Sequence, residues 1–176
     1  VGSLLDLSCG EERAITSRMN PQVTFGDDVL SRIQHASAGA SQRDDLHRAI
    51  TKALSEMIGE LCQTAEVPRR HVYEVAIAGN TTMEHLLCGM DVKQLGEVPF
   101  VPVFARGLML PAAELNLGIA ARGRAYVFPV VGGFVGGDTV AGVLATRIAD
   151  VEHTTVMIDI GTNGEIVLAH EGKLYA

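Results

Sequence analysis

Residues 159–165 read Asp-Ile-Gly-Thr-Asn-Gly-Glu (DIGTNGE) and continue an apolar run over 154–160 (TTVMIDI). Asn-Gly between two apolar runs is the strongest short-range signal for a β-hairpin. The two glycines also let the backbone approach an anion closely, and a carboxylate just before such a turn can hold Mg²⁺ or orient a water molecule. The stretch therefore predicts a strand, a turn and a second strand, with two readings open: phosphate chemistry beside Asp159, or an ordinary hairpin with a surface aspartate.

A second glycine-containing turn lies between a strand pattern and a helix pattern. Residues 72–78 (VYEVAIA) predict a strand, and 79–82 (GNTT) lead into an apolar helix over 83–88, with Thr81 and Glu84 spaced as a capping box. Free N–H groups and the dipole at a helix start attract anions. We expect Gly79, Asn80, Thr81 and Thr82 to line the same cleft as the 159–165 turn, and the alternative is that Thr81 is only an N-cap.

The third glycine-rich stretch has the same arrangement. Residues 126–131 (YVFPVV) predict a buried strand, 132–138 (GGFVGGD) a turn, and 139–148 a helix with Asp138 as its N-cap. One interpretation is a hinge near a nucleotide, formed by Gly136 and Gly137, with Asp138 facing phosphate or metal. The other is a flexible turn followed by a capped helix.

The N-terminal part predicts a hairpin and two helices. Strand patterns over 1–7 and 14–19 flank a polar turn, and 27–34 predicts a short helix. A flexible segment over 35–42 precedes the clearest amphipathic helix, over 44–62, which is marked by an N-cap signal at Ser41 and Asp44.

The rest of the sequence predicts a connection between two lobes, followed by a strand meander. Residues 98–111 carry three prolines and predict an irregular connection. The chain ends with strand, turn, strand, turn, strand over 154–176, whereas it begins with only strand, turn, strand, as though a first strand and its glycine turn were missing.

Composition limits the function classes. The 176 residues are 47 % hydrophobic and 20 % charged with net charge −7, which argues for a packed domain and against a nucleic-acid-binding surface. The three cysteines, Cys9, Cys62 and Cys88, form no metal or disulfide pattern. With neither a membrane-spanning run nor a signal peptide in the sequence, we expect a cytoplasmic protein without a membrane partner.

Four motifs in order resemble one family, the reductive activators of corrinoid proteins, which are iron-sulfur proteins with an actin-like ATPase domain. The motifs are NPQVTFGDDVLSRI over 20–33, GNTTMEHLL over 79–87, GGFVGGDTV over 132–140 and DIGTNGE over 159–165. The resemblance implies ATP and Mg²⁺ as cofactors and a corrinoid protein as partner, which is returned from Co(II) to Co(I) for methyl transfer. It also implies that Gly161, Thr162, Asn163 and Gly164 form the second phosphate-binding loop, with Asp159 as the Mg²⁺ or water partner.

The same resemblance implies an α/β fold of the actin-like (ASKHA) type, with RNase H-like lobes in which mixed sheets are flanked by helices. We expect 1–97 to be a first lobe that lacks its first strand and phosphate loop, 98–125 an irregular connection, and 126–176 the start of a second lobe. The chain is expected to be a fragment, truncated at both ends, of a longer protein that also carries a 2Fe-2S cluster domain.

Two further functions remain open. A small-molecule kinase would use the same fold, because actin-like lobes support many reactions. A non-catalytic module could instead dock a corrinoid protein through the proline-containing connection. The residues leave both a monomer and a homodimer open.

Overall fold

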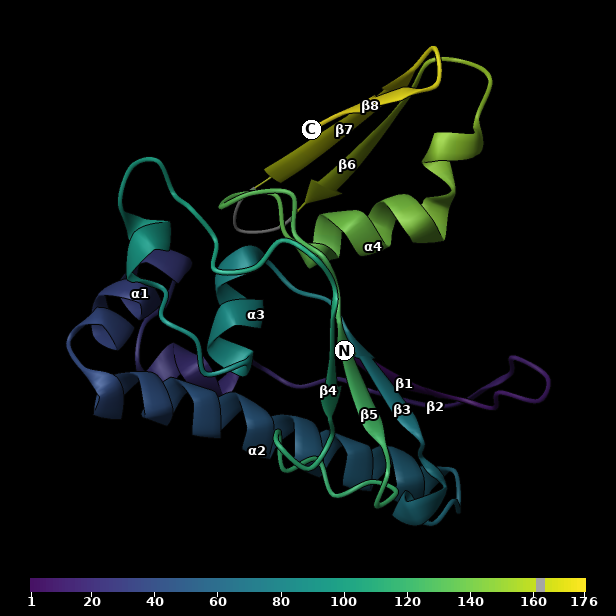
Figure 1. Ribbon diagram of the computed structural model, residues 1–176. Coiled ribbons are helices and arrows are strands. Elements are labelled where there is room, and N and C mark those ends of the chain that lie inside the picture. The colour runs from purple at the N-terminus through teal and green to yellow at the C-terminus, as the bar shows by residue number, and fades with distance from the viewer. Residues whose placement is uncertain (161–163) are drawn as a thin grey trace.

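The long helix α2 (Ala40–Thr64) lies beneath two separate sheets of the computed structural model, which describes residues 1–160 and 164–176 (Figure 1). The other helices and the strands are β1 (Gly2–Leu5), β2 (Glu12–Thr16), α1 (Val29–Ser37), β3 (Glu74–Ile77), α3 (Thr81–Leu87), β4 (Leu108–Pro111), β5 (Arg124–Val127), α4 (Gly137–Thr146), β6 (Thr155–Ile160), β7 (Gly164–His170) and β8 (Lys173–Tyr175). Short 3₁₀ turns occur at Pro21–Thr24, Arg69–His71, Lys93–Gly96 and Ile148–Asp150. The predicted α/β fold, with sheets and flanking helices, is confirmed.

The predicted N-terminal hairpin is present as the antiparallel pair β1–β2, which rests on α2. Gly2 of β1 lies close to α2, where an added Cβ would be 3.3 Å from the Met57 methyl carbon. At the outer side, Arg18 pairs with the carboxylates of Glu56 and Glu60 on α2. A two-stranded hairpin is marginal by itself, so these contacts with α2 hold it in place.

The flexible segment predicted over 35–42 is wrong. Helix α1 continues to Ser37 and α2 begins at Ala40, without a side-chain cap from Ser41 or Asp44. Burial of Ile33 and Ala36 against Leu46 of α2 explains the difference, because packing outweighs the weak helix propensity of the intervening residues.

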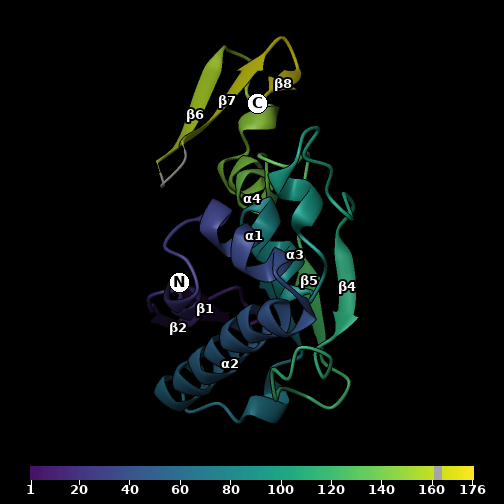
Figure 2. The same ribbon diagram turned by 90° about the vertical axis from the view of Figure 1, so that its left-hand side faces the viewer.

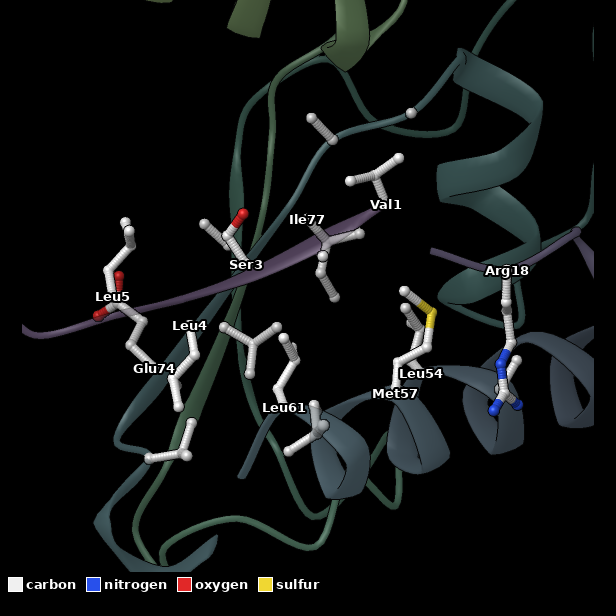
Figure 3. Close-up of a pocket in the computed structure, with 18 of the residues that line it drawn as sticks. Val1, Ser3, Leu4, Leu5, Arg18, Leu54, Met57, Leu61, Glu74 and Ile77 are labelled. Atoms are coloured by element: carbon white, nitrogen blue, oxygen red, sulfur yellow. The ribbon is translucent and has the colours of Figure 1, made fainter. Parts of the chain in front are cut away.

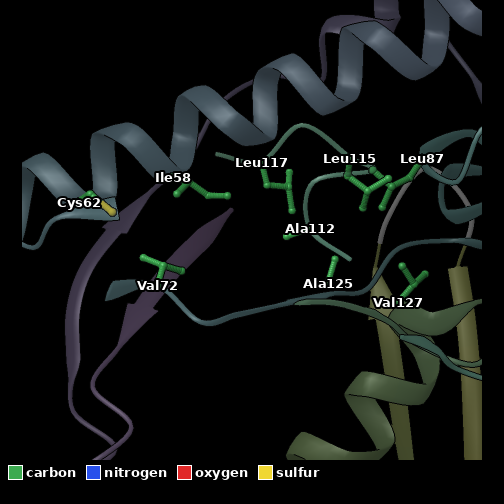
Figure 4. Close-up of a cluster of buried hydrophobic side chains, with 9 residues drawn as sticks. All are labelled: Ile58, Cys62, Val72, Leu87, Ala112, Leu115, Leu117, Ala125 and Val127. Carbon is green, nitrogen blue, oxygen red and sulfur yellow. The ribbon is translucent and has the colours of Figure 1, made fainter. Parts of the chain in front are cut away.

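The central sheet has the order β3–β5–β4, with β5 parallel to β3 and antiparallel to β4. Its helix-facing side packs on α2 around a buried cluster that Figure 4 shows: Ile58, Cys62, Val72, Leu87, Ala112, Leu115, Leu117, Ala125 and Val127. The prediction that all of 98–111 is irregular is therefore wrong at its end. Residues 108–111 pair as an edge strand, where the terminal Pro111 is tolerated.

The C-terminal meander β6–β7–β8 is antiparallel throughout, as predicted. It lies beside α4, at the end of the molecule away from α2 (Figures 1 and 2). Met157 on β6 approaches Gly142 on α4, where an added Cβ would lie 3.2 Å from its methyl carbon. No helix in residues 1–160 and 164–176 is long and apolar enough to cross a membrane.

Candidate functional site

Two of the three glycine-containing turns meet because β3 and β5 are parallel neighbours. The carboxyl ends of parallel strands lie at the same edge of a sheet, so the β3–α3 turn and the β5–α4 segment both start there. The Asp138 N–H donates to the Gly79 carbonyl over 3.1 Å, and the Thr81 hydroxyl donates to the Gly132 carbonyl over 2.6 Å. The tertiary structure thus brings together two sequence-predicted site segments that lie about fifty positions apart.

The contact between these segments depends on the lack of side chains at Gly136 and Gly137. A Cβ on Gly136 would lie 2.6 Å from both the Asn80 Cα and the Thr81 nitrogen. A Cβ on Gly137 would lie 2.0 Å from Oε1 of Glu84. Both glycines are buried. They therefore allow the two turns to pack closely, in addition to allowing the chain to reverse direction.

Glu84 is the buried acid of the site, and its role here was not predicted. It is only 1 % exposed, its Oε1 accepts a 3.2 Å hydrogen bond from the Gly79 N–H, and its Oε2 has no hydrogen-bond partner in the described part of the chain. Burial raises the pKa of Glu84 to about 8; the Gly79 hydrogen bond opposes this and the charge of Asp138 adds to it. The signal that could have identified it is a glutamate inside an otherwise apolar helix directly after a glycine turn.

The predicted caps of both helices are wrong. Asn80, and not Thr81, is the N-cap of α3, and its Oδ1 accepts from the Met83 N–H over 2.9 Å. Glu84 bonds to Gly79 rather than completing a capping box. Helix α4 begins at Gly137 with Gly136 as N-cap, so Asp138 lies inside its first turn. The start of α4 lies so close to Asn80 and Glu84 that only glycine fits at its first two positions, Gly136 and Gly137.

The described residues that flank the third predicted turn belong to the meander. Asp159 lies at the end of β6 and pairs in register with Glu165 of β7. The pKa of Glu165 is raised by partial burial and by the charges of Asp138 and Asp159, which places these three carboxyl groups within electrostatic reach. Gly164 begins β7, whereas the predicted ligands Gly161, Thr162 and Asn163 lie outside the described residues.

One predicted backbone donor of the first two turns is engaged within the protein. The Gly79 N–H donates to Oε1 of Glu84, and the neighbouring N–H groups of Met83 and Asp138 donate to Asn80 and Gly79. Thr82 is buried in the first turn of α3. Because a bonded N–H is not available to an anion, the Gly79 N–H supports the turn, whereas the N–H groups of Asn80, Thr81 and Thr82 have no acceptor within the described residues.

His85 is a second contributor that was not predicted. Its Nδ1–H donates to the Thr81 carbonyl over 2.7 Å, and its Nε2 accepts from the Val103 N–H over 2.9 Å. The ring stacks on Phe104 with centroids 4.4 Å apart, and burial lowers the pKa of His85. This neutral histidine ties the proline-containing connection to the start of α3.

The carboxyl groups do not form a closed metal cage. Among residues 1–160 and 164–176, no group of three or more His, Cys, Asp or Glu side chains is arranged to hold a metal ion. Mg²⁺, however, usually takes only one or two protein carboxylates and completes its shell with waters and substrate phosphates. Asp138 and Asp159 match that requirement in number and chemistry.

The fold and this site define a mixed α/β unit in which parallel strands deliver glycine-rich turns to an acidic edge. The chain belongs to the family described as the RACo middle region, whose sequence profile matches residues 1–151. The family resemblance predicted from the four motifs is thus confirmed.

Two similar proteins agree with this assignment. The chain is 35 % identical over 175 residues to the corrinoid activation enzyme RamQ of Eubacterium limosum, which covers 99 % of this chain and 29 % of RamQ. A solved structure of a reductive activator for corrinoid, iron-sulfur protein superposes with a TM-score of 0.94 at 35 % identity, over 98 % of this chain and 27 % of that one. The chain therefore spans less than a third of the length of either protein.

Replacing Gly137 with alanine should destabilise the fold, because the added methyl group would overlap the Glu84 carboxylate. We expect Gly137→Ala to lower the free energy of unfolding in urea by at least about 2 kcal/mol, within the usual range for overpacking. Gly132→Ala is the matched control, since a Cβ there meets nothing within 4 Å, and should change stability by no more than about 0.5 kcal/mol. Equal effects of the two substitutions would contradict the close packing.

The buried Glu84 should make stability depend on pH. Its carboxyl group titrates near 4.3 in an unfolded chain and at about 8 in the folded protein. The folded state retains a proton that the unfolded state loses between these values, so stability falls as pH rises from about 4.3 to 8, by on the order of a few kcal/mol. Glu84→Gln should flatten the fall in Tm between pH 5.5 and 8.5.

The control is Glu152→Gln, which changes an exposed glutamate and should follow the wild-type profile. A Glu84→Gln profile parallel to that of the wild type would show that Glu84 does not carry the effect.

Proposed function

We propose that this chain is part of an actin-like, ASKHA-type ATP-binding domain in a reductive activator, which returns a Co(II) corrinoid protein to the Co(I) state used for methyl transfer. Membership in the RACo middle region family and the likeness to a reductive activator for corrinoid, iron-sulfur protein support the proposal. In it, the chain contributes to two lobes whose boundary lies after β5 rather than at 98–125, because β4 and β5 share a sheet with β3, and a 2Fe-2S cluster lies elsewhere in the longer protein.

The observation that carries the nucleotide proposal is the meeting of two glycine-containing turns at one edge of the central sheet, with the start of α4 close to the acidic ends of β6 and β7. The β3–α3 and β5–α4 turns are locked together through Gly79, Thr81 and Gly136. The carboxylates of Asp138, at the start of α4, and Asp159, at the end of β6, both influence Glu165. Glycine-rich turns with neighbouring carboxylates are the elements that phosphate and Mg²⁺ binding require.

The role proposed for each residue follows from its position. In this proposal Gly161, Thr162, Asn163 and Gly164 cradle phosphate oxygens, while Asp159 and Asp138 hold Mg²⁺ or orient a water. Mg²⁺, when bound, supplies positive charge that offsets the phosphates. The turns at Gly79–Thr82 and Gly136–Gly137 position Asp138, because its N–H donates to the Gly79 carbonyl and the two glycines before it pack closely on Asn80 and Glu84.

In this scheme ATP controls a conformational change and is not the source of electrons. ATP that binds between two lobes shifts the equilibrium toward the closed arrangement. The size of the shift is set by the difference in nucleotide affinity between the closed and the open arrangement. Movement of the β5–α4 segment would reach the proline-containing connection, because Phe100 contacts Phe134 with ring centroids 4.8 Å apart and His85 bonds to Val103. Closure of the lobes would thus change the position of side chains on the surface of the connection.

Calorimetric titration of Mg-ATP tests the nucleotide site in the full-length protein. Asp159→Asn keeps the side-chain size and removes the charge, so we expect affinity to fall at least about tenfold, or about 1.4 kcal/mol. Asp44→Asn, at an exposed position on α2, is the control and should bind as the wild type does. Unchanged affinity in Asp159→Asn, or no binding by the wild type, would reject the proposed site.

A docking role is a second candidate, favoured by one group of exposed apolar side chains. Val98, Val101 and Val103 on the connection are 51–82 % exposed, and Val131 and Phe134 on the β5–α4 segment are 70 % and 64 % exposed. The Phe100–Phe134 contact joins the two segments. Exposed apolar groups that gather in this way mark protein contact sites more often than isolated ones do.

In the full-length protein, Val101→Asp should weaken binding of its corrinoid protein about tenfold, because a charge replaces a desolvated contact. Leu30→Asp, at an exposed position on α1, is the control and should bind normally. Binding that Val101→Asp leaves intact would exclude this surface, and binding that does not depend on nucleotide would favour a docking module over a gated one.

A further inference from the structure

Three hydrogen bonds run through His85 from the 131–135 segment to the proline-containing connection. The Thr81 hydroxyl donates to the Gly132 carbonyl, and the Thr81 carbonyl accepts from the Nδ1–H of His85. The other ring nitrogen, Nε2, accepts from the Val103 N–H. Because a backbone N–H can only donate, the proton of the neutral ring must be on Nδ1. One tautomer therefore satisfies both ring nitrogens.

This chain of hydrogen bonds connects the interior of the protein to its surface. His85 is 0 % exposed, whereas Val103 is 61 % exposed and belongs to the apolar surface of the connection. The ring also stacks on Phe104, the next residue. A buried histidine has a desolvation cost that an apolar residue lacks, and its two bonds offset that cost. The polar side chain at this position thus joins the start of α3 to the connection.

The start of α3 is also attached to Asp138, a proposed Mg²⁺ ligand. The Asp138 N–H donates to the Gly79 carbonyl over 3.1 Å, and Gly79 lies two residues before Thr81. Gly136 packs on the same place, because a Cβ there would lie 2.6 Å from the Thr81 nitrogen. Close-packed groups transmit a displacement to their neighbours. A movement of Asp138 toward bound Mg²⁺ would therefore reach Thr81 and, through its carbonyl, His85.

The other side of the β3–α3 turn faces away from these contacts. It borders a cavity of about 970 Å³, with Leu54, Met57 and Leu61 of α2 as its floor and with β1 across from β3 (Figure 3). In the described part of the chain no hydrogen bond joins the hairpin β1–β2 to residues 79–82. The turn is thus bonded toward the β5–α4 segment and, through His85, toward the connection.

We propose that His85 is the positioning residue that makes docking of a corrinoid protein on the connection depend on bound nucleotide. This inference rests on the proposed function, in which ATP controls a conformational change, and adds the residue through which that change reaches the docking surface. A competing route exists, because the Phe100 ring contacts Phe134 and a Cβ on Gly133 would lie 2.5 Å from the Phe100 carbonyl oxygen. The His85 bond is favoured because a hydrogen bond is directional, whereas apolar contact is not.

Asparagine and glutamine separate the two bonds of His85. The side-chain amide of asparagine reaches the position of Nδ1, and that of glutamine reaches the position of Nε2. His85→Asn should therefore keep the bond to Thr81 and lose the acceptor of the Val103 N–H, whereas His85→Gln should keep that acceptor. Both variants lose the ring that stacks on Phe104, so each is the control for the lost packing of the other.

The measurement is the affinity of the full-length protein for its corrinoid protein in the Co(II) state, with and without Mg-ATP. In the wild type we expect the two affinities to differ at least about fivefold. Their ratio should fall below about twofold in His85→Asn and stay within about twofold of the wild-type ratio in His85→Gln. A merely structural role of His85 would lower both affinities together and leave the ratio unchanged.

A second pair of variants changes the donor and leaves His85 in place, which decides the question if His85→Asn does not fold. Val103→Pro removes the N–H and should also bring the ratio below about twofold. Val103→Ala keeps the N–H and should keep the wild-type ratio, although it makes the docking surface smaller.

Hydrogen exchange checks the bond itself without nucleotide. The Val103 amide should exchange at least about tenfold faster in His85→Asn than in His85→Gln, because only glutamine retains the acceptor. Equal exchange of this amide in the two variants would overturn the role of His85.

A failure of this inference differs from a failure of the proposed function. A wild type whose affinity for the corrinoid protein does not depend on Mg-ATP would reject nucleotide control, and this inference with it. A wild-type ratio that persists in both His85→Asn and Val103→Pro would leave nucleotide control in place and overturn the role of His85. The contact between Phe100 and Phe134 would then be the route.

Discussion

The parallel pairing of β3 with β5 is the constraint on which the rest of the structure depends. It places the ends of two strands that lie fifty positions apart at one edge of the sheet. The turns that follow are then close enough for the Asp138 N–H to bond to the Gly79 carbonyl and for the Thr81 hydroxyl to bond to the Gly132 carbonyl. Without this pairing, the first turns of α3 and α4 would not lie next to each other.

Close approach at that edge determines which residues are permitted there. Gly136 and Gly137 leave no room for a methyl group, so the start of α4 packs directly on Asn80, Thr81 and Glu84. The cost is a buried carboxyl group with a raised pKa and an unsatisfied oxygen. Such local conflicts between polarity and burial are more common at functional sites than elsewhere, which is consistent with a role for this edge.

Helix α2 is the second organising element, because both the hairpin and the central sheet rest on it. Its apolar residues serve the cluster around Ile58 and Cys62 and also form the floor of the cavity beside β1.

Local patterns were sufficient for much of this protein. The 3.6-residue spacing of α2, the alternating strands β6 to β8 and the four family motifs could all be recognised from the sequence, because each depends on neighbours within one element. The capping pattern of Thr81 and Glu84 was misread, because it depended on where β3 ends and on what packs against the turn. The roles of Glu84 and His85 depend on partners at Gly79, Gly137 and Val103, which only the folded chain brings near. The sequence thus determined the elements and the family, whereas the tertiary structure decided which turns meet and which glycines are obligatory, since these depend on contacts between residues far apart in the chain.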